Sequence, residues 1–310
     1  MTATQRIGII GAPTEAGASQ RGTAMGPAAL RTADLIETLR ALGHDVTDFG
    51  DAAQAPPPAG AMPDAGQAAG WARALSGHMR EIAGDGRIPI VLGGDHSISL
   101  GSVAGMATIA ARRGRELFLL WLDAHPDFNT PQTSPSGNIH GIMVAFLCGL
   151  PGFEAILGAP LAHPLDPRNI MMLGIRSIDP PEQRLLLAHG IIVHDMRAID
   201  EHGITRLLGP FIETVAQRQG LLHVSFDVDF LDPEIAPGVG TTVPGGATIR
   251  EAHLVMEMLH DSGLVASLDL AELNPFLDER GRTARLVTDL AASLFGRRIM
   301  DRPTRTPWSA

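Results

Sequence analysis

The sequence predicts an α/β fold, a single doubly wound domain in which helices flank an eight-stranded, mostly parallel sheet. Eight short apolar runs recur along the 310 residues, and segments with helical spacing separate them. Most of the runs are apolar throughout, as expected for parallel strands that helices cover on both faces. This alternation of strand and helix is typical of a doubly wound sheet, and the length suits one domain spanning residues 1–310.

The individual elements follow from these runs. The expected strands are Arg6–Ile10, Asp45–Phe49, Ile88–Leu92, Leu117–Leu122, Asn169–Gly174, Ile191–His194, Leu221–Phe226 and Val265–Leu270. The expected helices include Pro27–Leu42, Gln67–Ala83, Arg250–Asp261 and Thr283–Phe295. The segment Asp51–Gly66, rich in Ala, Pro and Gly, predicts a surface loop, and Asp301–Ala310 predicts a loose C-terminal tail.

Composition excludes several classes of function. The 24 basic and 34 acidic groups give a net charge of −10, which predicts no nucleic-acid or membrane partner and fits a small cationic substrate. The chain has no lysine, which excludes Schiff-base chemistry and a phosphate-loop lysine. Cys148 is the only cysteine, so an intrachain disulfide and a paired-cysteine zinc site are excluded. The first residues predict a strand, not a signal peptide, and we expect a cytoplasmic protein.

Four of the expected strands end in polar clusters that could bind a ligand. The clusters are Gly93–Ser97, Asp123–Asn129, Asp227–Asp232 and, after the last strand, Glu272 with Asn274. Ligands of open α/β sheets bind outside the carboxyl ends of the strands. The sequence therefore predicts a site at this edge of the sheet.

The spacing within the clusters indicates a metal centre. Residues two apart on an extended chain point to the same side, so Asp123, His125 and Asp127 converge, as do Asp227 and Asp229. With His96 they make four carboxylates and two imidazoles, which need cations to stay ionised at close range. Oxygen-rich ligation that includes imidazoles favours two Mn²⁺ ions over Zn²⁺. Two bridged metals generate hydroxide at neutral pH and suit hydrolysis of a poorly electrophilic carbon.

Each residue alone has a plainer interpretation. His96 would be a hydrogen-bonded core histidine, an Asp-x-Asp would cap a helix, and Glu272 would be an ordinary charge at a strand end. Joint occurrence after four strands disfavours these interpretations, although Asp232-Pro233 is still expected to be a helix cap. The remaining histidines considered are expected to be structural or exposed: His163, His189, His194, His202, His223 and His253.

Three motifs together resemble the signatures of the ureohydrolases, the family that includes arginases and agmatinases. They are Gly93-Gly94-Asp95-His96-Ser97, Asp123-Ala124-His125-x-Asp127 and Ser225-Phe226-Asp227-Val228-Asp229-x-Leu231-Asp232-Pro233. The resemblance implies one Mn²⁺ held by His96, Asp123, Asp127 and Asp227. It implies a second held by Asp123, His125, Asp227 and Asp229, in a homotrimer or homohexamer. Pro126 departs from the pattern, since a Thr is more usual there, but it follows the strand end and leaves the ligands in place.

The resemblance also implies roles for residues around the metals. His140 is similar to the family's proton-shuttling histidine, and Glu272 to the glutamate that orients the guanidinium. In the mechanism that we expect, Asp127 would also help to accept the nucleophile's proton. The loop after Asp127 resembles that of arginases rather than agmatinases. In it Asn129, Ser136 and Asn138 would bind the substrate α-carboxylate, while Asp179, with Glu182 nearby, would contact the α-amino group.

These features together predict hydrolysis of L-arginine to L-ornithine and urea by a metal-bridging hydroxide. One alternative is a ureohydrolase that acts on agmatine or another guanidino compound. The other, from a different class, is a catalytically inactive arginine-binding regulatory protein on the same fold.

Overall fold

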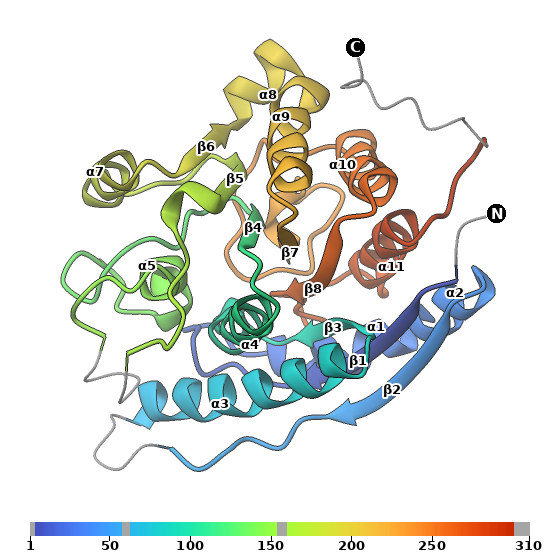
Figure 1. The fold of residues 1–310 in the computed structure, drawn as a ribbon, viewed down its shortest axis with the longest axis horizontal. Helices are drawn as coiled ribbons and strands as arrows, with labels where there is room; N and C mark the ends of the chain where they lie inside the picture. Colours follow the sequence, from blue (N-terminus) through green and yellow to red (C-terminus); the bar gives the residue numbers. More distant parts are fainter. Residues whose placement is uncertain (1–3, 58–62, 154–159, 301–310) are drawn as a thin grey trace.

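The computed structural model describes residues 4–57, 63–153 and 160–300, and its strands form one sheet (Figure 1). The strands are β1 (Arg6–Ala12), β2 (Asp45–Asp51), β3 (Ile88–Gly93), β4 (Leu117–Leu122), β5 (Ile170–Ile175), β6 (Ile192–Asp195), β7 (Leu221–Asp227) and β8 (Val265–Ala271). Their order is β2-β1-β3-β8-β7-β4-β5-β6, and every neighbouring pair is parallel. The predicted eight-stranded α/β fold is confirmed.

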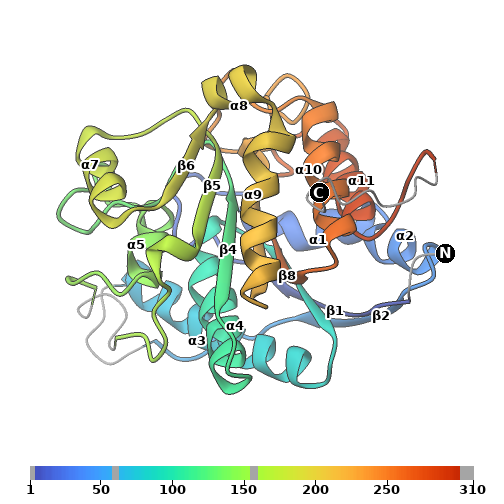
Figure 2. The same ribbon diagram turned by 45° about the horizontal axis from the view of Figure 1, so that its top comes forward.

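Helices cover both faces of this sheet, as Figures 1 and 2 show. One face carries α3 (Pro63–Gly84), α4 (Ser99–Arg112), α5 (Met143–Leu147) and α7 (Pro180–His189). The other carries α1 (Gly26–Thr32), α2 (Leu35–Ala41), α8 (Met196–His202), α9 (Ile204–Gln217), α10 (Ile249–Ser262) and α11 (Arg282–Leu294). No helix among the described residues is both long and apolar enough to cross a membrane.

The apolar strands supply both halves of the core because alternate side chains point to opposite faces. On β4, Phe118, Leu120 and Leu122 join the apolar layer of α9, α10 and α11. Leu119 and Trp121 join the layer of α3 and α4. A strand buried on both sides cannot alternate apolar with polar residues, which explains the continuous apolar runs in the sequence.

Two predicted segments differ in the structure. The single helix expected over Pro27–Leu42 is two helices, because Asp34 adopts a left-handed conformation with φ 60° at the position just before α2. Periodicity spans this break because both short helices bury the same kind of face. The loop expected over Asp51–Gly66 is shorter, since α3 begins at Pro63. Residues 58–62 and the predicted tail 301–310 lie outside the described residues.

The sheet order brings four polar clusters together. The clusters follow β3, β4, β7 and β8 in the chain, and these four strands are adjacent in the order β3-β8-β7-β4. All of them run in the same direction, so their carboxyl ends lie side by side on one side of the sheet, near the middle of the strand order. The position agrees with the rule for open α/β sheets.

Shortening a buried side chain on an interior strand should destabilise the fold. Leu120 is fully buried on β4, so Leu120→Ala should lower the free energy of unfolding by about 2–5 kcal/mol through lost burial and the cavity it leaves. Leu187→Ala on α7 is the matched control, because that side chain is 78% exposed and its loss should change stability by less than about 0.5 kcal/mol. Urea unfolding followed by circular dichroism measures both variants. Equal midpoints would contradict this placement of the core.

Candidate metal centre and active site

His96 lies directly after β3, where the chain turns into a short helix, His96–Ile98. Its ring is fully buried and stacks on Trp121 with centroids 4.0 Å apart and planes 9° apart. The Nε2 atom lies 2.8 Å from Ser225 Oγ, which fixes the ring orientation. The other ring nitrogen, Nδ1, therefore faces the carboxylates at the strand ends.

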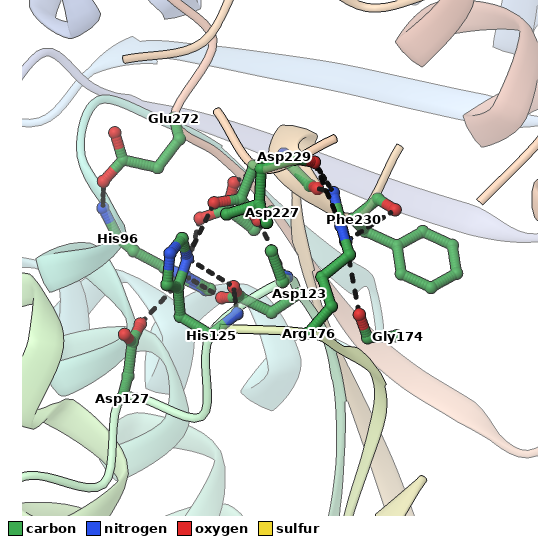
Figure 3. Close-up of polar contacts among 12 residues, drawn as sticks. His96, Asp123, His125, Asp127, Gly174, Arg176, Asp227, Asp229, Phe230 and Glu272 are labelled. Carbon is green, nitrogen blue, oxygen red and sulfur yellow. Dashed lines mark hydrogen bonds and ion pairs between the residues drawn. The ribbon is translucent and has the colours of Figure 1, made fainter. Parts of the chain in front are cut away.

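Three carboxylates surround that nitrogen (Figure 3). His96 Nδ1 lies 3.0 Å from Oδ2 of Asp123, 3.0 Å from Oδ2 of Asp227 and 3.5 Å from Oδ2 of Asp127. His96, Asp123 and Asp127 offer ligand atoms close enough together to hold one metal ion. The structure thus brings together the four residues predicted for the first ion.

A second group of potential ligands adjoins the first and shares Asp123 with it. His125 Nδ1 lies 2.9 Å from Asp229 Oδ2 and 3.5 Å from Asp123 Oδ1. Asp123 thus uses one oxygen on each side, as a bridging carboxylate would. The predicted bridging role of Asp227 is supported only on the His96 side and otherwise stays a prediction.

The chemistry of this donor set fits divalent cations. His96 Nδ1 and Asp123 Oδ2 are buried 3.0 Å apart, yet neither forms a hydrogen bond with any described residue. Burial and repulsion from Asp123 hold the pKa of Asp127 well above its usual range, and burial and repulsion from Asp229 do the same for Asp227. Burial lowers the pKa of His96, but Asp123 and Asp227 outweigh it and raise that pKa well above 6.5. Cations among these groups would relieve both the repulsion and the unmet bonding.

Two of the predicted catalytic residues have strained backbones. Asp127 has φ 50° and Glu272 has φ 64°, in the left-handed region that favours glycine. Non-glycine residues persist there only where surrounding contacts hold them, and such residues cluster at functional sites. Val144 N donates to Asp127 O at 2.9 Å, and Glu272 N donates to Gly94 O at 2.8 Å, so both positions are held.

The partly buried His140 and the buried Glu272 form a pair beside the potential metal ligands. His140 Nδ1 lies 2.9 Å from Glu272 Oε1, and the same oxygen accepts the backbone N–H of His96 at 2.8 Å. Burial lowers the pKa of His140, but the bond to Glu272 outweighs it and raises that pKa to about 9. Glu272 Oε2 accepts no hydrogen bond within the described part of the chain and remains available to a substrate.

A cavity of about 350 Å³ opens above the carboxylates. All the predicted catalytic and substrate-binding residues line it: Asp127, Asn129, Ser136, Asn138, His140, Asp179, Glu182 and Glu272. All five metal candidates other than His96 also line the cavity and form its floor: Asp123, His125, Asp127, Asp227 and Asp229. None of the six histidines expected to be structural or exposed lines the cavity.

The substrate-binding candidates already form hydrogen bonds with one another or lie against His140. Asn129 Nδ2 donates to Asp179 Oδ2 at 3.0 Å, and Asn138 Nδ2 lies 3.4 Å from His140 Nε2. Asn129 and Asp179 form part of the rim of the cavity, and Glu182 lies behind them. Its carboxylate accepts the backbone N–H groups of Phe128 at 2.7 Å and Asp179 at 3.3 Å. Burial raises the pKa of Glu182 to about 7. Glu182 therefore supports the rim, while Asp179 presents the more accessible carboxylate.

The comparison with known proteins agrees with this geometry. A model described as the Arginase family matches residues 5–296. The chain belongs to the arginase family. An arginase of Agrobacterium fabrum is 57% identical over 301 residues, which cover 96% of this chain and 92% of that protein.

Crystal structures in the same family have the same fold. The arginase of Bacillus caldovelox superposes with a TM-score of 0.88 at 38% identity, covering 96% of this chain and 100% of that one. The Entamoeba histolytica arginase, solved in complex with L-ornithine, gives 0.85 at 29% identity, with coverage of 96% and 100%.

Three features of this arginase-family site were missed by sequence reasoning. Arg176, after β5, donates to the carbonyl oxygens of Asp229 at 2.6 Å, Val243 at 2.7 Å and Gly174 at 3.2 Å, and so fixes the loop after β7 (Figure 3). Residues 18–20 and Thr241 line the cavity. Arg176 could have been found, because β5 ends at the same edge; the two loop segments carry no comparable signal.

Asp232 was expected to cap a helix, and this expectation is wrong. Its Oδ1 accepts the N–H of Glu234 at 2.9 Å, and its Oδ2 accepts those of Gly245 at 2.8 Å and Gly246 at 3.0 Å. The residue caps a turn and ties the two ends of a long loop together, and the next α-helix, α10, begins only at Ile249.

Added Mn²⁺ should stabilise the metal-free protein, and more so at higher pH. Burial and mutual repulsion raise the pKa values of Asp127, Asp227 and Asp229 above 3.8, so the metal-free fold loses stability as pH rises above that value. Bound cations remove that cost and must displace fewer protons at high pH. The rise in Tm on adding Mn²⁺ to EDTA-treated protein should therefore be larger near about pH 8 than near about pH 6.

Differential scanning fluorimetry measures these shifts. Asp229→Asn should reduce the Mn²⁺-dependent shift, while Asp200→Asn, an exposed carboxylate on α8, is the control that should keep it. An equal or larger shift at the lower pH would count against ionised carboxylates as the cation ligands.

Proposed function

We propose that this protein hydrolyses the guanidinium group of L-arginine to give L-ornithine and urea, with two Mn²⁺ ions bound. The observation that carries the proposal is the pair of adjoining ligand groups that share Asp123 beneath a cavity rimmed by Asn129 and Asp179. Similarity to proteins named arginase at up to 57% identity among those compared supports the same reaction.

The chain's own residues supply the ligands. One ion would be held by His96, Asp123, Asp127 and Asp227, and the other by Asp123, His125, Asp227 and Asp229. Two bound Mn²⁺ ions would lower the pKa of a shared water so that it attacks at neutral pH. The oxygen-rich set with two imidazoles favours Mn²⁺ over Zn²⁺.

The groups above the floor hold the substrate and move protons. Glu272 Oε2, which accepts no hydrogen bond from any residue that the structure describes, would pair with the guanidinium and place its carbon over the floor of the cavity. Asp127 would accept the proton that the attacking water loses. His140, held protonated by Glu272, would donate a proton to the amine of the departing ornithine, which balances the transfer.

The rim would select the amino-acid end of the substrate. Asp179 offers a carboxylate to the α-amino group, with Glu182 holding the backbone of Asp179. Asn129, Ser136 and Asn138 offer amide and hydroxyl donors to the α-carboxylate, directly or through water. A cavity of about 350 Å³ lies in the range of small-molecule sites.

Assembly and location complete the proposal. We propose a homotrimer or homohexamer, on the basis of the family resemblance, and a cytoplasmic location. Light scattering coupled to size-exclusion chromatography tests the first proposal, and cell fractionation tests the second.

Substrate choice is the decisive test. Rim groups that pair with the α-carboxylate are left unmatched by agmatine, so kcat/KM for arginine should exceed that for agmatine by at least about 10²-fold. The assay measures urea released by metal-stripped protein after adding Mn²⁺, Mg²⁺ or Zn²⁺. Faster turnover of agmatine would make the protein a different ureohydrolase, and absence of urea with every metal would favour an arginine-binding regulator.

Replacing His140 should slow turnover without removing metal. His140→Asn removes the proton donor but leaves all six proposed ligands, so kcat should fall by about 10²-fold while the metal content of the purified protein is unchanged. His202→Asn is the matched control, because His202 is exposed at the end of α8 and should retain full activity. Metal loss in His140→Asn, measured by elemental analysis, would make His140 a ligand or a structural residue.

A further inference from the structure

We propose that Asp95 is a positioning residue that holds His140 in place through the backbone of Gly17. The inference rests on the proposed role of His140 as a proton donor, and it adds a residue that touches neither the cavity nor the proposed ligand set.

The link consists of two consecutive hydrogen bonds, the first of them buried. Asp95 is fully buried, and its Oδ2 accepts the N–H of Gly17 at 2.8 Å. The carbonyl oxygen of Gly17 then accepts the N–H of His140 at 3.1 Å. The other oxygen of Asp95 accepts the N–H of Ser97 at 2.9 Å, which fixes the carboxylate against the turn after β3.

The ring of His140 is fixed from the same point of the chain. His140 Nδ1 bonds to Glu272 Oε1, and that oxygen accepts the backbone N–H of His96, the neighbour of Asp95. The contacts close a circuit in which one dipeptide, Asp95-His96, holds both the backbone and the ring of His140. A proton donor placed this way keeps its distance from the floor of the cavity fixed.

Only glycine at position 17 lets the backbone approach Asp95 and Ser97 this closely. A Cβ built at Gly17 would lie 2.7 Å from Asp95 Oδ1 and 2.7 Å from Ser97 Cβ, closer than real Cβ contacts. The same loop makes a second bond to the segment before His140, because Asn138 Nδ2 donates to Ser19 Oγ at 3.2 Å. The loop around Gly17 is thus clamped between Asp95 and the His140 segment.

A charged group is not needed merely to cap the turn at residue 95. A carboxylate that is fully buried and forms no ion pair within the described residues carries a desolvation cost that a neutral side chain would avoid. Its advantage is that both oxygens accept, and accept more strongly than a neutral amide, so the turn and Gly17 are held together. An asparagine keeps only one accepting oxygen.

The first test compares two independent ways of breaking the link. Asp95→Asn and Gly17→Ala should each lower kcat between about 10-fold and 10²-fold, with KM for arginine and metal content close to wild type. Gly77→Ala on α3 is the matched control, because a Cβ there meets nothing within 4 Å. If Asp95→Asn does not fold, Gly17→Ala decides, and unchanged kcat in the variant that folds overturns the proposal.

The second test asks whether the effect passes through His140. In the His140→Asn background, adding Asp95→Asn or Gly17→Ala should lower kcat by less than about a further 2-fold, because the side chain that they position is already absent. Full additivity would overturn the proposal and make Asp95 a general structural residue.

A readout that does not depend on activity separates this inference from the proposed function. Hydrogen–deuterium exchange should show faster exchange of the Gly17 and His140 amides in Asp95→Asn, with the strand β4 amides unchanged. If wild-type protein released no urea, the proposed function would fail while the clamp could still be seen by exchange. Unchanged exchange at both amides would overturn the proposed link from Asp95 through Gly17 to His140, whatever the activity.

Discussion

The rest of the structure depends on the electrostatics of four carboxylates buried at one edge of the sheet. Asp123, Asp127, Asp227 and Asp229 all lie within a few ångströms of the two imidazoles, and each is at least nine-tenths buried. Repulsion and burial both oppose ionisation of such a group. The surrounding fold therefore has to supply compensation, and two divalent cations would supply most of it.

The backbone provides part of this compensation in a repeated form. Asp95, Asp123 and Asp227 follow or end β3, β4 and β7, and each accepts the N–H of the residue two positions later, at 2.6–2.9 Å. Each turn presents the following residues to the cavity floor or its wall. In addition, Asp229 accepts the N–H of Ala124 at 2.9 Å, which links the turns after β4 and β7. The same carboxylates thus shape the turns and, for two of them, offer oxygens to a metal.

This double use explains how far the sequence could predict the site. In the sequence, turn capping and metal binding are alternative interpretations of an aspartate. In the structure Asp123 combines both geometries, because it caps its turn through Oδ1 and faces His96 through Oδ2. Spacing of two residues along the strand ends was sufficient to group the ligands, and continuous apolar runs were sufficient to predict parallel strands. Strand order was not predictable from one sequence, because it depends on packing between segments far apart in the chain. The bond from His140 to Gly17 was hidden for the same reason: 123 positions separate residues that meet only after folding.

The floor and the rim of the cavity are joined by three consecutive residues. Asp127 faces His96, Phe128 N donates to Glu182, and Asn129 donates to Asp179. Asp179 and Glu182 belong to the start of α7, so this helix holds the loop that carries a proposed metal ligand with φ 50°. A strained backbone keeps its conformation only while such contacts persist. Changes that loosen the start of α7 would therefore reach the proposed metal ligand Asp127 as well as the rim, so the proposed substrate-binding groups and the proposed metal ligands are mechanically coupled through this helix.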